Sequence, residues 1–345
     1  MKARFEHQPG RLQLWLFGPG TGELVVVHVP PAGWLVVDGC APGGESWAVR
    51  FFEHMAARPA LRIRPTHVLL SHPHLDHAAG VTELIDWCFS QGHAPRLAAV
   101  PRPSTRRVSR DDLAKSVAAG QALAALNAIG RWWKRRPTTK WPLRAGREVR
   151  LGGGRLWFLS PEQAVVHNAE KRARQHKPVS WNELASALLL RWGRTRVVLG
   201  SDLTDNGWPA ALKRTPKGEL QVLKVAHHGS RGAQSPQLLA RFQPTAQFMC
   251  TPFAREDLPR FADAEGAHLL LQVVPQLHLT GLPHAHDQQA NRPRRFARPA
   301  LAADVDDFIA DDGPRGFPDS WVKLCVDANG RRTFAHGPGS VIVTR

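Results

Sequence analysis

Short apolar runs separated by turn residues predict β structure near the start of the chain. RLQLWLF, GELVVVHV and GWLVVD lie between residues 11 and 38 and are divided by Gly and Pro. Runs of this length, bounded by turn residues, are typical of buried strands. We therefore predict a meander of three strands in this region.

Strand and helix patterns then alternate as far as residue 251. Apolar runs predict further strands at 66–71, 95–101, 155–160, 186–192, 196–202, 222–228 and 246–251. Helical spacing of apolar residues predicts helices at 47–58, after Asp76, at 109–133 and at 235–242. This order predicts an α/β fold in which two sheets carry helices on their outer faces.

The pattern weakens beyond Thr251. Residues 282–318 are rich in Pro, Arg and Asp without periodicity and predict a long loop, whereas 321–345 predict a closing hairpin turned at Asn329-Gly330. We therefore divide the chain into a core at 1–251 and a C-terminal extension at 252–345. The extension is expected to complete or cap the second sheet.

Composition indicates a soluble globular protein. Of 345 residues, 43% are hydrophobic and 22% charged, and no apolar run is long enough to span a bilayer. The N-terminal segment lacks the apolar region of a secretory signal. The four cysteines are widely spaced and are expected to be reduced thiols. We therefore expect a cytoplasmic protein without a membrane partner.

A strong positive charge favours polyanionic partners. The formal net charge is +17, and a basic insertion at 102–150 holds thirteen Lys or Arg against three Asp or Glu. At its centre, cations alternate with aromatic side chains that suit phosphates and stacked bases: Arg131, Trp132, Trp133, Lys134, Arg135 and Arg136. Nucleic acid, DNA or RNA, is the partner predicted. The alternative is a solvated helix end whose tryptophans pack on the core.

The segment Ser71-His72-Pro73-His74-Leu75-Asp76-His77 is the sharpest chemical signal. It directly follows the predicted strand at 66–71. In an extended segment, residues two apart project to the same side, so His72 and His74 can converge on one ion. Asp76 and His77 begin the next helix, where they can face a second ion. Imidazole and carboxylate ligands suit Zn²⁺, or Mn²⁺ where oxygen ligands dominate.

Two later strand ends carry further candidate ligands. Asp202 follows the strand at 196–202, and its carboxylate could bridge two metals, although an aspartate there is also common in turns. His227-His228-Gly229-Ser230 ends the strand at 222–228. One of the two histidines is expected to point into the site. Gly229 permits close backbone approach, and Ser230 could hold a phosphate oxygen.

The order of these motifs resembles the metallo-β-lactamase superfamily of binuclear hydrolases, and most closely the soluble hydrolase domain of the competence protein ComEC. Four stretches carry the resemblance: FGPGTGE with WLVVDG, SHPHLDH, NELAS followed by LGSD, and LKVAHHGS. They span about residues 11–251. The resemblance implies a four-layer αββα sandwich, to which the basic insertion and the C-terminal extension are added.

The resemblance also implies roles for individual residues. Two divalent cations, zinc or alternatively manganese, are expected to be held by His72, His74, Asp76, His77, Asp202 and His228, with Asp202 as the bridge. Asp38 is expected to orient a ligand histidine. Asp76, His227 and Asp202 are the predicted catalytic residues. The family commonly has Asp in place of His74, and the further histidine that many relatives supply before the bridging aspartate has no clear counterpart here.

The expected activity is hydrolysis of phosphodiester bonds, by a nuclease acting on DNA or RNA. Lys224 and Ser230 are expected phosphate contacts, and three weaker candidates for the site are His167, His284 and His286. One alternative is a phosphodiesterase of a small molecule, such as a cyclic nucleotide or a choline-phosphate ester. A pocket closed by residues after 251 would favour that alternative. The other alternative is a nucleic-acid-binding subunit with a vestigial hydrolase core.

Overall fold

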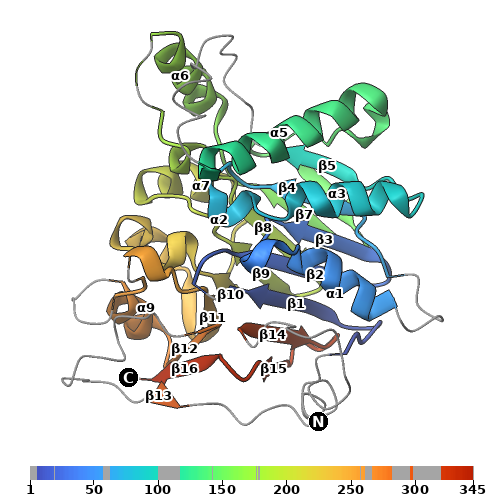
Figure 1. Ribbon diagram of the computed structural model, residues 1–345. Helices are drawn as coiled ribbons and strands as arrows, with labels where there is room; N and C mark the ends of the chain where they lie inside the picture. The colour runs from blue at the N-terminus through green and yellow to red at the C-terminus, as the bar shows by residue number, and fades with distance from the viewer. Residues whose placement is uncertain are drawn as a thin grey trace.

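Two β-sheets lie face to face, with helices on their outer sides (Figure 1). The structure is a computed structural model that describes residues 6–18, 20–56, 63–99, 117–141, 143–175, 177, 179–256, 258–260, 266–281, 296–297 and 320–344. Among these residues we find no helix with the length and apolar character needed to cross a membrane.

The first sheet has seven strands in the order β15-β14-β1-β2-β3-β4-β5. Their bounds are β1 Leu12–Phe17, β2 Leu24–Val29, β3 Gly33–Val37, β4 His67–Leu70, β5 Arg96–Ala99, β14 Trp321–Val326 and β15 Arg332–His336. The first three strands form the predicted antiparallel meander. Because β3, β4 and β5 are parallel, their carboxyl ends reach the same edge of the sheet.

The second sheet has nine strands in the order β13-β16-β12-β11-β10-β9-β8-β7-β6. Their bounds are β6 Glu148–Leu151, β7 Gly154–Phe158, β8 Leu188–Trp192, β9 Thr195–Leu199, β10 Leu220–Lys224, β11 Phe242–Cys250, β12 Gln276–Leu279, β13 Phe296–Ala297 and β16 Val341–Thr344. Strands β9 to β12 run parallel, so their carboxyl ends also share one edge.

Helices cover the outer face of each sheet. Their bounds are α1 Trp47–Ala56, α2 Leu75–Ala78, α3 Val81–Ser90, α5 Val117–Arg135, α6 Gln163–Arg174, α7 Trp208–Arg214, α8 Pro236–Leu239 and α9 Ala267–Val273. Figure 1 shows α1, α3 and α5 over the first sheet. Residues of α7, α8 and α9 share a buried cluster with the outer face of the second sheet.

The alternation of side chains along β1 shows how the layers form. Leu14 and Leu16 belong to the cluster between the two sheets, whereas Trp15 points to the outer face and packs with α1. Successive residues of a strand face opposite sides, and both sides of β1 are covered by apolar neighbours. This explains why the predicted strands are continuous apolar runs. The predicted α/β sandwich of helices, two sheets and helices is confirmed.

The C-terminal segment contributes to both sheets. Strand β14 pairs with β1 in the first sheet, and β12 and β16 extend the second. Besides β12, β13 and β16 of the second sheet, the residues after 251 thus supply β14, an antiparallel partner to the edge of β1 in the first sheet. The predicted hairpin at Asn329-Gly330 joins β14 to β15, and Gly330 adopts a positive φ of 83°. The boundary at 251 stays a prediction.

Candidate metal centre

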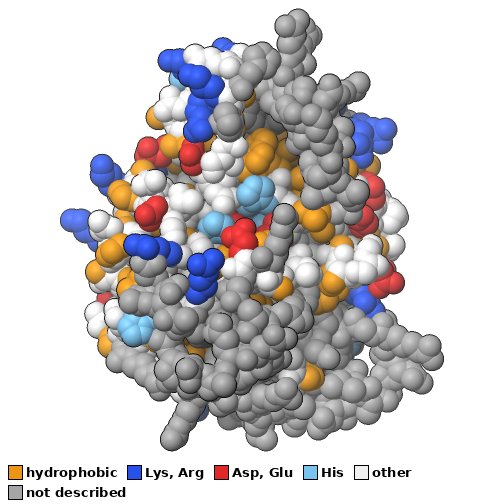
Figure 2. Space-filling model, turned by 60° about the vertical axis from the view of Figure 1, so that its left-hand side comes forward, with side chains coloured by type: hydrophobic (Ala, Val, Ile, Leu, Met, Phe, Trp, Pro, Cys, Tyr) orange, Lys and Arg blue, Asp and Glu red, His pale blue; other side chains and the backbone are white. Residues whose placement is uncertain are grey.

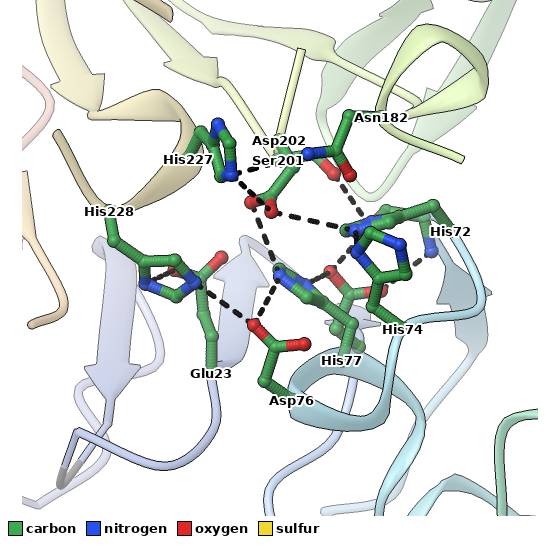
Figure 3. Close-up of polar contacts among 12 residues, drawn as sticks. Glu23, His72, His74, Asp76, His77, Asn182, Ser201, Asp202, His227 and His228 are labelled. Atoms are coloured by element: carbon green, nitrogen blue, oxygen red, sulfur yellow. Dashed lines mark hydrogen bonds and ion pairs between the residues drawn. The ribbon is translucent and has the colours of Figure 1, made fainter. Parts of the chain in front are cut away.

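Side chains from four strand ends gather at one edge of the sandwich (Figure 3). Asp38 follows β3, the SHPHLDH segment follows β4, Asp202 follows β9 and the two histidines follow β10. Parallel strands place their carboxyl ends together, which is why ligands distant in sequence meet here. The last of these segments is the 3-10 turn η5, Ala226–Gly229.

The first group of potential ligands is His72, His74 and Asp202. Nε2 of His72 lies 3.1 Å from Nδ1 of His74 and 3.5 Å from a carboxylate oxygen of Asp202. Two imidazole nitrogens therefore face each other beside a carboxylate. The predicted convergence of His72 and His74 is confirmed, since a ring nitrogen of each lies within 3.1 Å of the other.

The second group is Asp76, His77, Asp202 and His228. Nε2 of His77 lies 3.2 Å from Oδ1 of Asp202 and 3.6 Å from Oδ2 of Asp76. Nε2 of His228 lies 3.2 Å from the same Asp76 oxygen. Asp202 belongs to both groups, one oxygen toward each, which is the arrangement expected of a bridging carboxylate.

The donor set fits a pair of divalent cations. Nε2 of His77 and Oδ1 of Asp202 are buried and 3.2 Å apart, yet among the described residues neither atom has a partner in hydrogen-bonding geometry. Leaving buried polar atoms without partners is costly, and a cation would satisfy both. Ligand atoms about 2.0–2.2 Å from a tetrahedral ion lie about 3.3–3.5 Å apart, close to the spacings found here. The cluster is therefore a candidate dimetal site.

The electrostatics of the site keep its carboxylates ionised. Burial alone would raise the pKa of Asp202, but His77 and His72 hold that pKa well below its ordinary value. Burial would likewise lower the pKa of His77, yet Asp202, Asp76 and Asp38 raise it well above its usual value. Burial, and then the charge of His72, lower the pKa of His74 to about 4. Without a cation, the carboxylates thus stay ionised and favour a second proton on His77, which a bound metal ion would displace from Nε2.

Asp38 orients His77 from behind the cluster. Its Oδ2 lies 2.8 Å from Nδ1 of His77, while Ser71 donates to both carboxylate oxygens of Asp38. With Nδ1–H donated to Asp38, the Nε2 lone pair of His77 faces the other ligands. The position is the one expected for Asp38. Ser71 and Ser201, whose hydroxyl donates to the Ser71 hydroxyl at 2.7 Å, were not predicted.

The backbone is strained where it delivers these side chains. Positive φ angles occur at Asp38 (64°), Ser201 (46°), His227 (47°) and His228 (51°). These are the only non-glycine residues with positive φ among those that the structure describes. Such angles cost energy for residues with a Cβ and persist where the surrounding packing fixes them, which is common at functional sites. All four strained residues lie in or beside the cluster.

His228 is fixed from its other side by a chain of buried polar groups. Nδ1 of His228 lies 2.9 Å from the hydroxyl of Thr251, and that hydroxyl donates to Glu23. Glu23 in turn pairs with Lys224, and both side chains are buried. The expectation that Lys224 contacts a phosphate is therefore corrected, because its ammonium is enclosed and neutralised by Glu23. Sequence reasoning missed Glu23 and Thr251.

His227 lies beside the ligands without joining either group. Its Nε2 lies 3.2 Å from the amide nitrogen of Asn182 and 3.8 Å from Asp202, and its Nδ1 lies 2.9 Å from the Ser230 hydroxyl. The structure thus places His228 toward the second group and His227 next to it, as preferred from the sequence. Within the described residues, no partner reaches the buried carbonyl oxygen of Asn182. Asn182 lies in one of the quoted motifs but was not predicted as a site residue.

A cavity of about 700 Å³ opens beside His227. Its lining combines the turn after β10 with residues beyond 251, namely Thr204, His227, Gly229, Ser230, Arg231, Gly232, Glu256, Leu258, Arg260 and Gly266. Figure 2 shows a face on which histidine and acidic side chains adjoin each other, with Lys or Arg side chains nearby. Ser230, an expected phosphate contact, does line this space.

Comparison with known proteins agrees with the arrangement of strands and ligands. The model of the metallo-β-lactamase superfamily matches residues 18–154. The chain has the metallo-β-lactamase fold. The match includes Asp38 and the SHPHLDH segment, whereas Asp202 and His228 lie beyond it. No curated protein matches the chain.

Solved structures with this fold resemble the chain at low identity. The diiron β-hydroxylase CmlA from Streptomyces venezuelae is 15% identical, with a TM-score of 0.35, covering 65% of this chain and 36% of that one. A metallo-β-lactamase from Staphylococcus aureus is 11% identical, with a TM-score of 0.31, covering 55% and 42%. A diphosphatase of the PhnP family is 12% identical, with a TM-score of 0.34, covering 69% and 85%. The chain thus spans about two fifths of the length of the first two structures.

The basic cluster at the end of α5, residues 131–136, is remote from the metal centre. Helix α3 begins at Val81, four residues after His77, and its ten residues span about 14 Å. Trp132 stacks on Phe89 near the far end of α3, and Trp133 donates to the carbonyl of Leu97. The expectation that these tryptophans stack on bases is therefore corrected, because both pack against the core.

The cations of this cluster cover the same aromatic rings. The guanidinium of Arg135 lies 5.6 Å from the centre of the Trp132 ring, and that of Arg136 lies 5.6 Å from the centre of the Phe89 ring. Arg131 and Lys134 are exposed on the same helix end. These residues form a solvated helix end that is not part of the metal centre, which was the alternative considered from the sequence.

The three weaker histidine candidates find no support. His167 is exposed on α6 and, within the described ranges, belongs to neither group of ligands. Its place in the site is therefore corrected. His284 and His286 lie outside the described residues.

Proposed function

We propose that this chain is a binuclear metal-dependent hydrolase of phosphodiester bonds, related to the hydrolase domain of ComEC. One observation carries the proposal: a cavity with two arginines, Arg231 and Arg260, adjoins the candidate dimetal cluster at His227. Guanidinium groups bind phosphate through paired hydrogen bonds and give little advantage with a neutral lactam. Two divalent cations, when bound, supply Lewis-acid activation of water and of the phosphoryl group.

The protein groups divide this work between holding the ions and placing the substrate. His72, His74 and Asp202 would hold one ion, and Asp76, His77, His228 and Asp202 the other. His227 and Ser230 face the cavity from the cluster side and would contact the phosphoryl group. The four imidazole ligands favour zinc, with manganese as the alternative.

The pocket favours a small phosphodiester over a polymer. Its walls include Glu256, Leu258 and Arg260, which lie beyond residue 251. A pocket lined by residues after 251 is the feature that we expected of a small-molecule phosphodiesterase. The net charge of +17 keeps a nuclease as the second candidate, with nucleic acid as its partner. The remoteness of the α5 cluster removes the more specific argument for that partner.

A reducing compartment such as the cytoplasm is part of the proposal. All four cysteines are free and buried. Thiols stay reduced in such a compartment, whereas disulfides persist under oxidising conditions.

Hydrolysis assays with the purified full chain test the activity. We expect protein loaded with Zn²⁺ or Mn²⁺ to cleave bis(p-nitrophenyl) phosphate and to lose that activity on chelation. Oligonucleotides, single- and double-stranded, are assayed in parallel to separate the two substrate classes. The Asp202→Ala variant is the control. No cleavage of any phosphodiester by the metal-loaded protein, or equal cleavage by the control, would overturn the proposal.

A further inference from the structure

The cavity beside His227 is bounded by two segments far apart in the chain. One wall is the turn Gly229–Gly232, which continues from the histidine pair into the short 3-10 turn η6, Arg231–Ala233. The other wall comes from Glu256, Leu258, Arg260 and Gly266. His227 belongs both to this lining and to the surroundings of the metal ligands. A molecule bound at the cluster can therefore extend directly into the cavity.

Close backbone packing fixes the two walls against each other. A Cβ on Gly229 would lie 2.7 Å from Cβ of Pro259, and a Cβ on Gly266 would lie 3.1 Å from the carbonyl oxygen of Gly229. Both glycines also have positive φ, 77° and 66°, which side chains rarely allow. The amide of Ala267, at the start of α9, donates to the carbonyl of Arg260. The cavity is thus already formed without a ligand.

A second contact ties the far wall to a metal ligand. The ring of Phe253 stacks on His228, with ring centres 5.0 Å apart. Two backbone hydrogen bonds join Phe253 and Leu258, closing a loop that carries Glu256. The wall that lines the cavity is therefore in contact with His228, a member of the second group of potential ligands.

The charges of the lining are mostly positive. Arg231 and Arg260 bring two guanidinium groups, against the single carboxylate of Glu256. Ser230 and Thr204 add hydroxyl groups that can donate to an oxyanion. Both arginines are exposed to the cavity side of the surface rather than buried. Two guanidinium groups and two hydroxyls form a suitable environment for a phosphate or carboxylate.

We propose that this cavity binds a second anionic group of the substrate, remote from the bond that is cut, through Arg231 and Arg260. The substrate class is then a nucleotide-sized phosphodiester that carries a further terminal phosphate or carboxylate. This inference rests on the proposed phosphodiesterase activity and adds to it the feature that determines specificity. A diester without the second anion would make no contact with Arg231 or Arg260.

A pair of dinucleotides measures the effect of the second anion alone. Dithymidine phosphate contains only the diester, and its 5′-phosphorylated form adds one terminal phosphate. We expect kcat/KM to be about tenfold or more higher for the phosphorylated form, the usual scale of a charge-assisted hydrogen bond. In the double variant Arg231→Gln/Arg260→Gln the ratio of the two kcat/KM values should fall to about one. The control Arg155→Gln, at an exposed position of β7, should keep the wild-type ratio.

Binding to chelator-treated protein separates this inference from the proposed activity. Thymidine monophosphate, measured by calorimetry without metal, should bind wild-type protein at least about fivefold more tightly than the double variant. If no diester is hydrolysed but this difference is found, the activity proposal fails and the anion site stands. If the diesters are hydrolysed without preference, or the preference survives loss of both arginines, the anion site is overturned.

Glu256 provides an independent test of whether the cavity binds an anionic or a cationic group of the substrate. Replacing Glu256 by Gln removes the one carboxylate of the lining and should tighten binding of thymidine monophosphate several-fold. A substrate with a cationic group, such as a choline-phosphate ester, would use that carboxylate instead. Weaker monophosphate binding by Glu256→Gln, or faster turnover of p-nitrophenyl phosphorylcholine than of the phosphorylated dinucleotide, would contradict an anion site.

Discussion

The ammonium group of Lys224 is buried against the carboxylate of Glu23, although the two residues are 201 positions apart in the chain. Each side chain is only 1% exposed. Lys224 ends β10 and Glu23 precedes β2, so this ion pair joins the two sheets at the edge where the metal ligands gather. Through Thr251 it also reaches His228.

Breaking this pair should be strongly destabilising. Lys224→Met leaves the Glu23 carboxylate buried without its cation, which typically costs about 3–5 kcal/mol. The double variant Glu23→Gln/Lys224→Met should lose less stability than Lys224→Met alone, because no uncompensated charge remains. Urea unfolding of the metal-free proteins measures both. Equal losses in the single and double variants would show that the pairing itself is not what matters.

Asp202→Ala should remove the group shared by the two ligand sets. We expect wild-type protein to carry about two divalent ions per chain and the variant at most one, with phosphodiesterase activity lowered by at least about a thousandfold. Plasma mass spectrometry of dialysed protein gives the metal content. Asp205→Ala, an exposed residue three positions later, is the matched control. Two retained ions in Asp202→Ala would contradict its bridging position.

Asp38→Asn should weaken the metal centre without removing a ligand. The Asp38 carboxylate accepts from Nδ1 of His77, and loss of such a partner typically lowers metal affinity about 10–100-fold. Competition with a chromophoric chelator measures the change. Ser71 would still hold the side chain in place, so the fold should persist. Unchanged affinity would show that Ser71 and the backbone suffice to orient His77.

The free energy of unfolding should fall below neutral pH because of buried histidines far from the metal ligands. Nδ1 of His278 lies 3.0 Å from Nε2 of His336, and burial, with the charge of His336, lowers the pKa of His278 to about 3. Burial lowers the pKa of His336 to about 4. Below about pH 6.5 the unfolded chain binds protons at these residues that the folded protein does not. The contribution of these residues to the free energy of unfolding is thus fully present above that pH and is lost as the pH falls from about 6.5 to about 3.

The expected loss from each of these histidines at pH 5 is about 2 kcal/mol. Urea unfolding at pH 7.5 and pH 5, in the presence of chelator, measures it. The His336→Gln variant should show a pH dependence smaller by about that amount. If wild type and variant lose the same free energy between the two pH values, the buried pair is not the cause.

The basic end of α5 should have no part in hydrolysis of small diesters. Replacing both Arg135 and Arg136 by Gln is expected to leave kcat/KM for bis(p-nitrophenyl) phosphate within about twofold of the wild-type value. Salt screens exposed charges that lie more than about 8 Å from the reacting group. The same variant is tested for binding a single-stranded oligonucleotide. A fall of tenfold or more in small-diester hydrolysis would place this end of the helix at the metal centre.

The sequence alone predicted the strands as far as β11, except β6, and the order of the candidate ligands along the chain. These features are local. A short apolar run predicts a strand, and the backbone of a few residues sets the spacing of the potential ligands in SHPHLDH. The positions of Asp38 and His228 could also be predicted, since both directly follow parallel strands whose carboxyl ends share an edge.

Only the tertiary structure decided what the charged and aromatic residues touch. Lys224 was an expected phosphate contact and is paired with Glu23, while Trp132 was an expected stacking platform and packs on Phe89. The arginines of the cavity come from segments brought together by the close approach of Gly229 and Pro259. The sequence around a charged or aromatic residue is the same whether its side chain faces solvent or contacts a residue far along the chain. Its role depends on packing between distant segments, which no local periodicity records.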